Sequence, residues 1–253
     1  MLTGTSYSSP AITTVMTVFH PQLLNETTEI QEFRSALLRW GKDHYQDLPW
    51  RKSLAVWQGL VTEILLQRTR AMQVVPVFEK FRNQYPTVQD FSNASRDEIS
   101  ELIRPLGLRW RAPLLYDLAQ LINETSGQVP LDEKTLQQWP GVGPYVSSAT
   151  LSLHANRRAV IIDSNVVRVL CRVVGQPYDG ETRRKRWFRE LTERLTPRAS
   201  FREYNYALLD LATAVCRPSL PRCDECPLVS MCLSSGLTLE RNTPQANARY
   251  VRS

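Results

Sequence analysis

Hydrophobic residues recur at intervals of three to four positions along most of the chain, which is the period of an amphipathic helix. Short breaks that contain Pro, Gly or Asp separate these periodic segments. The longest segment has room for two successive helices. The pattern predicts helices over Ile30–Tyr45, Leu54–Tyr85, Asp97–Ile103, Ala112–Glu124, Asp132–Trp139, Tyr145–Leu153, Ser164–Val174, Thr182–Leu195 and Arg202–Val215.

Runs that alternate between hydrophobic and polar residues, as half-buried strands do, are scarce in this chain. The segment Arg158–Ile162 is short and apolar, and we interpret it as a buried connector. These observations predict an all-α protein whose two ends fold back into a common domain. Residues 1–26, which are rich in Ser and Thr, predict a flexible tail, and residues 236–253 predict a polar C-terminal tail.

The chain carries 31 basic and 25 acidic residues, which gives a net charge of +6 and a pI near 9.2. This balance suits a polyanionic partner such as nucleic acid but does not by itself identify one. No apolar run approaches the roughly 20 residues that span a bilayer. The N-terminus lacks the basic start and apolar centre of a secretory signal. We therefore expect an intracellular monomer, in the cytoplasm or nucleoid, with no membrane partner.

Four of the five cysteines lie within 17 residues near the C-terminus, spaced C-x6-C-x2-C-x5-C. An odd number of cysteines, most of them in one short segment, favours a metal site over a framework of disulfides. Four thiolates on short loops are close enough to surround one compact metal centre, and by ligand type alone zinc is its commonest occupant. The predicted ligands are Cys216, Cys223, Cys226 and Cys232.

A tight turn joins two of the predicted helices at Pro140–Gly143. Its two glycines allow backbone conformations that bring the chain close to a DNA strand. Pro144 suits the first position of the next helix, whose free N–H groups favour a phosphate. Taken alone, this turn is weak evidence, because most such turns only connect helices.

Asp163 follows an apolar run and precedes a predicted helix, a position where an aspartate is most often only an N-cap. It also lies eighteen residues after Tyr145, in the order helix, hairpin, helix, aspartate. Together with the cysteine spacing, this order resembles the helix-hairpin-helix DNA glycosylase superfamily. The cysteine loop is similar to the [4Fe–4S] loop of its endonuclease III-like members. The resemblance extends from about Trp40 to Cys232.

The resemblance implies two helical domains. One is a six-helix barrel that contains the helix-hairpin-helix, over residues 56–171. The other combines residues 27–55 with 172–235 and carries the cysteine loop, so the resemblance favours a [4Fe–4S] cluster over zinc. The implied activity is that of a base excision repair glycosylase, which flips a mispaired or damaged base out of double-stranded DNA and cleaves its N-glycosidic bond.

Segments Pro49–Arg51 and Val61–Thr69 resemble a region shared by adenine glycosylases and mismatch-specific thymine glycosylases, in which the residue matching Glu63 is catalytic. A glutamate on a mostly buried helix has its proton affinity raised by desolvation, whereas the simpler alternative is a solvated helix glutamate. We expect Asp163 to stabilise a cationic sugar and orient water, with support from Asn165. Glu63 would then handle protons on the base side.

Tyr145 stands where the strand-nicking members of this superfamily carry a lysine. That lysine attacks the sugar and forms a Schiff base. Tyrosine cannot form a Schiff base, so we expect a monofunctional enzyme that leaves an abasic site. The alternative interpretation of Tyr145 is a packing aromatic at the start of a helix.

Further side chains are candidates for DNA binding. Gln67 or Arg68 is the candidate wedge that fills the base stack after flipping, and Arg68 is also a candidate contact to the unpaired guanine. The segment Leu106–Ala112 resembles the family's G-L-x-x-x-R-A element with one residue fewer. The predicted contacts are Gln67, Arg68, Arg109, Arg111, Gly141, Val142 and Gly143.

Thymine or uracil opposite guanine is the expected substrate. The segment Gln67–Thr69 lies closer to the thymine branch, and only 21 residues follow Cys232, where adenine glycosylases normally continue into a second domain. The alternatives are an adenine glycosylase acting opposite 8-oxoguanine or guanine, a DNA-binding scaffold without chemistry, and a helical zinc protein. The joint presence of Glu63, Tyr145 and Asp163 argues against the scaffold.

Overall fold

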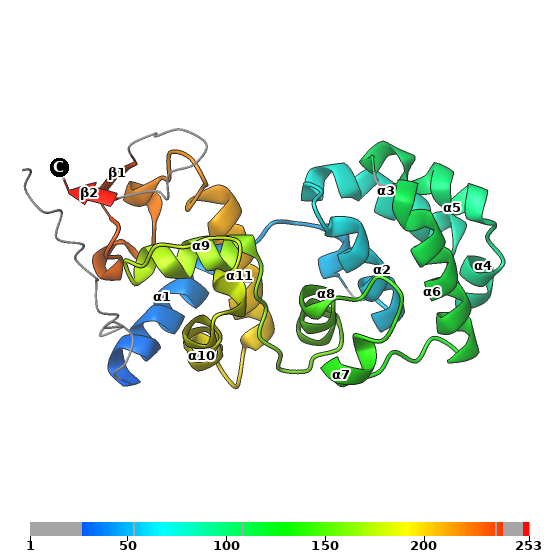
Figure 1. Ribbon diagram of the computed structural model, residues 1–253, viewed down its shortest axis with the longest axis horizontal. Coiled ribbons are helices and arrows are strands. Elements are labelled where there is room, and N and C mark those ends of the chain that lie inside the picture. Colours follow the sequence, from blue (N-terminus) through cyan, green and yellow to red (C-terminus); the bar gives the residue numbers. More distant parts are fainter. Residues whose placement is uncertain (1–26, 53, 108, 236, 240–249, 253) are drawn as a thin grey trace, which may run out of the picture.

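The computed structural model describes residues 27–52, 54–107, 109–235, 237–239 and 250–252. Helices form two lobes that lie side by side (Figure 1). The α-helices are α1 (Thr27–His44), α2 (Val56–Leu66), α3 (Ala71–Gln84), α4 (Val88–Ser92), α5 (Arg96–Ile103), α6 (Ala112–Glu124), α7 (Glu133–Leu136), α8 (Pro144–Ala149), α9 (Ser164–Val173), α10 (Arg186–Leu195) and α11 (Phe201–Ala214). A π-helical turn, η4, covers Thr150–His154. The 3-10 turns are η1 (Pro49–Arg51), η2 (Arg104–Leu106), η3 (Arg109–Arg111), η5 (Thr182–Arg184), η6 (Cys223–Glu225) and η7 (Val229–Met231).

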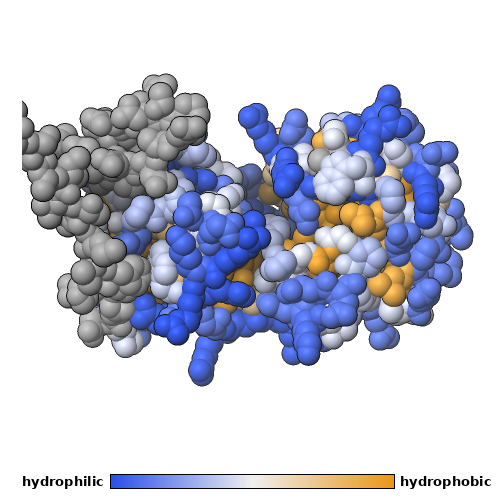
Figure 2. Space-filling model, viewed as in Figure 1, coloured by the Kyte–Doolittle hydropathy of each residue, from blue (hydrophilic) through white to orange (hydrophobic). Residues whose placement is uncertain are grey.

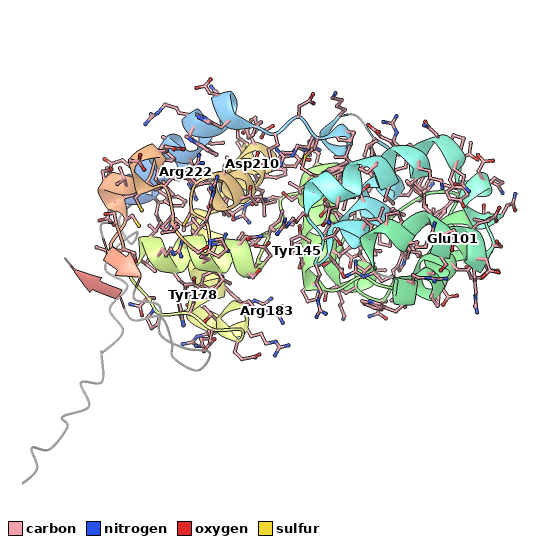
Figure 3. The ribbon with its side chains drawn as sticks, turned by 90° about the horizontal axis from the view of Figure 1, so that it is seen from above. Glu101, Tyr145, Tyr178, Arg183, Asp210 and Arg222 are labelled. Atoms are coloured by element: carbon pink, nitrogen blue, oxygen red, sulfur yellow. The ribbon has the colours of Figure 1, made fainter. Side chains whose placement is uncertain are left out.

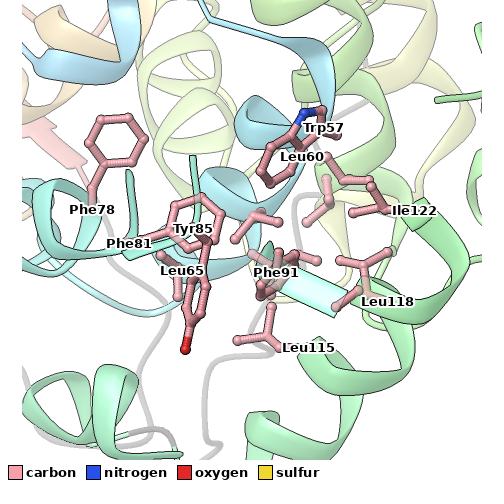
Figure 4. Packing of buried hydrophobic residues seen from close by; sticks show 14 of the residues in the cluster. Trp57, Leu60, Leu65, Phe78, Phe81, Tyr85, Phe91, Leu115, Leu118 and Ile122 are labelled. Carbon is pink, nitrogen blue, oxygen red and sulfur yellow. The ribbon is translucent and has the colours of Figure 1, made fainter. Parts of the chain in front are cut away.

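The lobe that contains α2 to α8 is built around a single hydrophobic cluster (Figure 4). Helix α2 lies within this cluster, because eight of its eleven residues are buried. Trp57 of α2 packs in parallel against Phe91, with ring centroids 6.1 Å apart, and edge-on against Phe81 at 5.9 Å. Each such side chain contributes roughly 1.5–3 kcal/mol when fully buried. The central position of α2 is what removes Glu63 from solvent.

The second lobe joins the two ends of the described chain. Helix α1 packs along α11, and together with α9 and α10 they enclose a second hydrophobic cluster. Phe33 and Leu37 come from α1, whereas Leu208 and Leu211 come from α11, so this core depends on residues more than 170 positions apart. The prediction of an all-α fold in which the chain ends share a lobe is confirmed. The residue boundaries of the two domains stay a prediction.

Two connectors, over residues 45–52 with 54–55 and over residues 155–163, run between the lobes (Figure 1). The first is fixed by Arg51, which makes two hydrogen bonds to the carboxylate of Asp210 on α11, at 2.7 and 2.8 Å. The second is the segment predicted to be a buried connector; it has no regular structure, and its Ala159 and Ile161 side chains are buried. These contacts hold the lobes on either side of a cleft.

Several element boundaries differ from the pattern-based prediction. Leu54–Tyr85 is two helices, as expected, and the break contains Arg68 in the left-handed region at φ +59°. The helix predicted over Asp132–Trp139 is only the single turn α7, which ends at Leu136; it cannot extend through Trp139 because Pro140 disfavours helical backbone there. Helix α4 was not predicted, and a capping box between Thr87 and Asp90 begins it.

The described part of the predicted C-terminal tail has regular structure. Strands β1 (Leu237–Leu239) and β2 (Tyr250–Arg252) pair in antiparallel register, which the pattern did not predict. Residues 1–26 and most of the remaining predicted tail lie outside the described residues. Within the described residues, no helix combines the length and hydrophobicity needed to cross a membrane.

Candidate active site

A cleft between the two lobes is lined by side chains from both of them. Figure 2 shows the surface hollowed between the lobes, and Figure 3 shows Tyr145 at their junction. The cleft brings together Glu63, Tyr145, Asp163 and Asn165, which are separate in sequence. Nine arginines and six acidic residues line it, and this excess of positive charge in a concave surface suits a polyanion. The lining arginines that are not bonded to Asp210 are Arg68, Arg70, Arg158, Arg168, Arg183, Arg184, Arg189 and Arg217.

Glu63 lies on α2 with its side chain only 2% exposed, yet both of its carboxyl oxygens have partners. The hydroxyl of Tyr145 donates to Oε2 at 3.2 Å. Nε2 of His154 lies 2.9 Å from Oε1. A buried carboxylate is stable only when its oxygens accept hydrogen bonds, and these two partners meet that requirement. The predicted solvated helix glutamate is therefore not what the structure shows.

Asp163 caps α9 with one carboxyl oxygen and is held by a neighbour through the other. The backbone N–H of Val166 donates to Oδ1 at 2.7 Å, and the Asn165 amide donates to Oδ2 at 2.8 Å. Burial raises the pKa of the Asp163 carboxyl above its ordinary value, against the opposing effect of these hydrogen bonds. Capping thus fixes the carboxyl group at the cleft without excluding a chemical role, so the two interpretations made from sequence are compatible.

Tyr145 lies in the first turn of α8, directly after the hairpin. Burial, followed by the nearby carboxylates of Glu63 and Asp163, raises the pKa of its phenol well above the ordinary value. Tyr145 is therefore a neutral hydrogen-bond donor. Tyr145 is also close enough to both candidate catalytic carboxylates for their charges to act on its phenol.

The hairpin has the geometry that its glycines allow. Gly141 adopts φ +76°, which favours glycine, and Gly143 is the N-cap of α8 with open space around its Cα. Gly143 and Pro144 line the cleft, so the N–H groups at the start of α8 lie at its edge. Val142, by contrast, is buried in the hydrophobic cluster of this lobe and does not line the cleft.

The remaining predicted DNA contacts separate into exposed and buried residues. Gln67 and Arg68 line the cleft, in the turn between α2 and α3. Arg111 is 2% exposed, and its guanidinium donates to the carbonyls of Ile64 and Gln67 at 2.7 and 2.8 Å. Arg111 therefore supports the strained turn at Arg68 and does not face the cleft. Arg109 is exposed, lies outside the cleft lining and pairs with Glu101.

The four clustered cysteines line one small cavity of about 30 Å³ in the second lobe, next to α9 and α11. Burial raises the pKa of the Cys226 thiol to about 11 and that of Cys232 in the same direction. Arg172 is 4% exposed and lies beside the cavity, where its Nη1 is 3.4 Å from Sγ of Cys216. A buried cation at this place would balance part of the negative charge that metal-bound thiolates carry.

Sequence reasoning missed three residues of the site. His154 contacts Glu63, the Tyr206 ring lines the cleft, and Arg51 lies over that ring at 4.3 Å. Burial, followed by the Glu63 charge, raises the pKa of Tyr206. No local pattern marked His154 or Tyr206. Arg51 was part of a segment whose resemblance was noted, but its partner Asp210 is 159 positions away.

Comparisons with known proteins agree with this geometry. Residues 61–196 match the family described as HhH-GPD superfamily base excision DNA repair protein. The chain is 35% identical to a thymine/uracil-DNA glycosylase of Pyrobaculum aerophilum, over 82% of this chain and 93% of that protein. It is 34% identical to an adenine DNA glycosylase of Rattus norvegicus, over 83% of this chain and 43% of that protein. A solved thermostable thymine-DNA glycosylase superposes with a TM-score of 0.75 at 32% identity, over 81% of this chain and 96% of that one. The chain therefore belongs to the HhH-GPD superfamily of base excision DNA repair proteins.

Proposed function

We propose that this DNA glycosylase hydrolyses the N-glycosidic bond of a flipped thymine or uracil opposite guanine in double-stranded DNA. The observation that carries the proposal is the arrangement of Glu63, Tyr145 and Asp163 in one basic cleft. Flipping costs roughly a few kcal/mol and costs least at a mispair, which favours mispaired bases as substrates. Such an enzyme acts inside the cell, where its DNA substrate is.

In the proposed reaction the bond between sugar C1′ and the base nitrogen breaks. Positive charge develops on the sugar, and Asp163 at the cleft stabilises it and orients a water molecule. That water supplies a hydroxyl group to C1′ and releases a proton. The nitrogen of the departing base, no longer bonded to the sugar, gains a proton. Glu63 is the group that exchanges protons at the base. The product is an abasic site and a free base.

We propose a monofunctional reaction because position 145 holds a tyrosine. The described residues that line the cleft include no lysine, so no side-chain amine there is placed to form a Schiff base. The neutral phenol of Tyr145 instead donates to Glu63. This contact assigns Tyr145 to positioning the carboxylate.

Thymine or uracil is the first choice for the released base, and adenine is the second. The match to the thymine/uracil relative covers 93% of that protein's length. The adenine relative is almost equally similar at 34% identity and supports the alternative, although the chain spans less than half of its length. Gln67 and Arg68, at the cleft, are the residues whose match to the thymine branch favours the first choice.

We further propose that Cys216, Cys223, Cys226 and Cys232 hold a [4Fe–4S] cluster. They line one small cavity, so the four thiols are near enough to share one metal centre. Their C-x6-C-x2-C-x5-C spacing resembles the iron–sulfur loop of endonuclease III-like proteins, which favours the cluster over zinc. The bound cluster would supply cross-links that stabilise the C-terminal loop.

A panel of four duplexes tests the proposed function. Purified protein is incubated with T:G, U:G, A:G and A opposite 8-oxoguanine, and the strands are analysed with and without alkali. We expect base release from T:G or U:G, with breaks only after alkali. Release from the adenine duplexes alone would establish the second candidate. Binding to mispaired DNA without release from any duplex would contradict an enzymatic function.

A further inference from the structure

His154 is a buried titratable side chain for which the proposed reaction has no role. It ends the π-helical turn η4, and its side chain is 2% exposed. The turn closes with a hydrogen bond from the Ala155 N–H to the Thr150 carbonyl at 3.0 Å. This bond spans one residue more than an α-helical bond does, so His154 points in a different direction than it would in a continued α-helix. Such π turns occur often at functional sites. Here the turn directs the histidine toward α2.

Helix α2 is shaped to receive the histidine ring. A Cβ atom built on Gly59 would lie 2.2 Å from Cγ of His154, so only glycine allows the ring to lie against the helix. Gly59 and Glu63 are four residues apart and share one face of α2. The ring therefore reaches along α2 from Gly59 to the carboxyl group of Glu63, where Nε2 is 2.9 Å from Oε1.

We propose that His154 is a positioning residue that holds the carboxyl group of Glu63 in its working orientation; this inference rests on the proposed function. The two oxygens of Glu63 have different hydrogen-bond partners, Tyr145 on Oε2 and His154 on Oε1. With both oxygens engaged, the carboxyl group cannot rotate about its last bond. Where Glu63 is a carboxylate it only accepts hydrogen bonds, and Nε2 of His154 is then the donor.

Two polar substitutions separate this role from simple packing. In His154→Gln the side-chain amide nitrogen takes the place of Nε2 and still donates to Glu63. In His154→Asn the amide lies at the place of Nδ1 and cannot reach Oε1. The two variants have similar polarity, so they differ mainly in this one contact. His44→Gln is the matched control, because His44 is an exposed residue of α1 that stacks on Trp40.

The experiment measures single-turnover base release at saturating enzyme, on whichever duplex of the panel the wild type cleaves. We expect His154→Asn to slow release about 10- to 100-fold, a part of the roughly 10²- to 10⁴-fold that acid–base catalysis contributes. His154→Gln and His44→Gln should stay within about threefold of the wild type. Affinity for a duplex carrying tetrahydrofuran opposite guanine should not change in any of the variants, since His154 is not among the residues that line the cleft.

A double-mutant cycle with Glu63→Gln completes the test. If His154 acts only through Glu63, adding His154→Asn to Glu63→Gln causes no further loss. Losses that multiply, or equal rates for His154→Asn and His154→Gln, would overturn the inference. If His154→Asn does not fold, the rate of base release by His154→Gln tests the inference instead. A fall of more than about tenfold in the rate of a folded His154→Gln protein would contradict the proposed contact. A wild type that releases no base would instead disprove the proposed function itself.

Discussion

The ion pair between Arg51 and Asp210 allows a quantitative prediction about what holds the lobes together. Arg51 lies on the connector between the lobes and Asp210 on α11, and their side chains are 13% and 2% exposed. Arg51→Ala removes two hydrogen bonds of 2.7 and 2.8 Å from a buried carboxylate. Breaking a buried pair by removing one partner costs about 3–5 kcal/mol, because the remaining charge is left uncompensated.

Two further contacts determine where in that range the free-energy cost of Arg51→Ala lies. Gln46 continues to donate to Asp210 from its backbone N–H at 3.2 Å and from its side-chain amide at 2.9 Å, which lowers the cost. The loss of the Arg51 guanidinium above the Tyr206 ring adds about 0.5–1 kcal/mol. We expect a loss of about 3–4 kcal/mol in the free energy of unfolding, which corresponds to a fall of roughly 6–16 °C in Tm at about 2–4 °C per kcal/mol.

Thermal unfolding followed by circular dichroism measures this loss. Arg186→Ala is the matched control, since Arg186 is 91% exposed and pairs with Glu190 at 3.6 Å. Exposed pairs of this kind contribute about 0–1 kcal/mol, so the control should shift Tm by only a few degrees. Equal Tm values for Arg51→Ala and Arg186→Ala would refute the reasoning. They would show that the connector is held by hydrophobic packing instead.

Three other substitutions test the proposed site. Asp163→Asn should abolish base release while keeping the cap on α9. Because burial raises the pKa of Asp163, ionising it in the folded state costs free energy of folding. This cost is absent below the ordinary pKa and fully present above the raised pKa. The Tm of the variant minus that of the wild type should therefore be larger at pH 7 than at pH 4. A smaller difference at pH 7 than at pH 4 would contradict the sign of this effect. Tyr145→Lys should gain weak lyase activity and a covalent adduct trapped by borohydride, whereas trapping of the unmodified protein would exclude a monofunctional reaction. Cys223→Ser should lose iron and the broad visible absorption of an iron–sulfur protein, and stoichiometric zinc in anaerobically prepared wild type would disprove the proposed cluster.

Local chemistry explains what the sequence alone determined about this protein. Helical periodicity predicts most helices, because burial of one face dominates their stability. An aspartate before an apolar segment predicts the N-cap at Asp163, and Pro144 predicts the start of α8; both depend on backbone groups within a few residues. The cysteine spacing likewise brings four thiols to one cavity, since the connecting loops are too short to separate them.

Only the tertiary structure decided how distant residues combine. Arg111, predicted to contact DNA, is buried and supports the turn at Arg68, because the carbonyls it needs are over 40 positions away in sequence. His154 carries no local signal, and its contact with Glu63 depends on a π turn and on the absence of a side chain at Gly59. Hydrophobic periodicity records which face of a helix is buried but not which partner covers it. The orientation of the candidate catalytic carboxylate therefore depends on how α2 packs against the turn that follows α8.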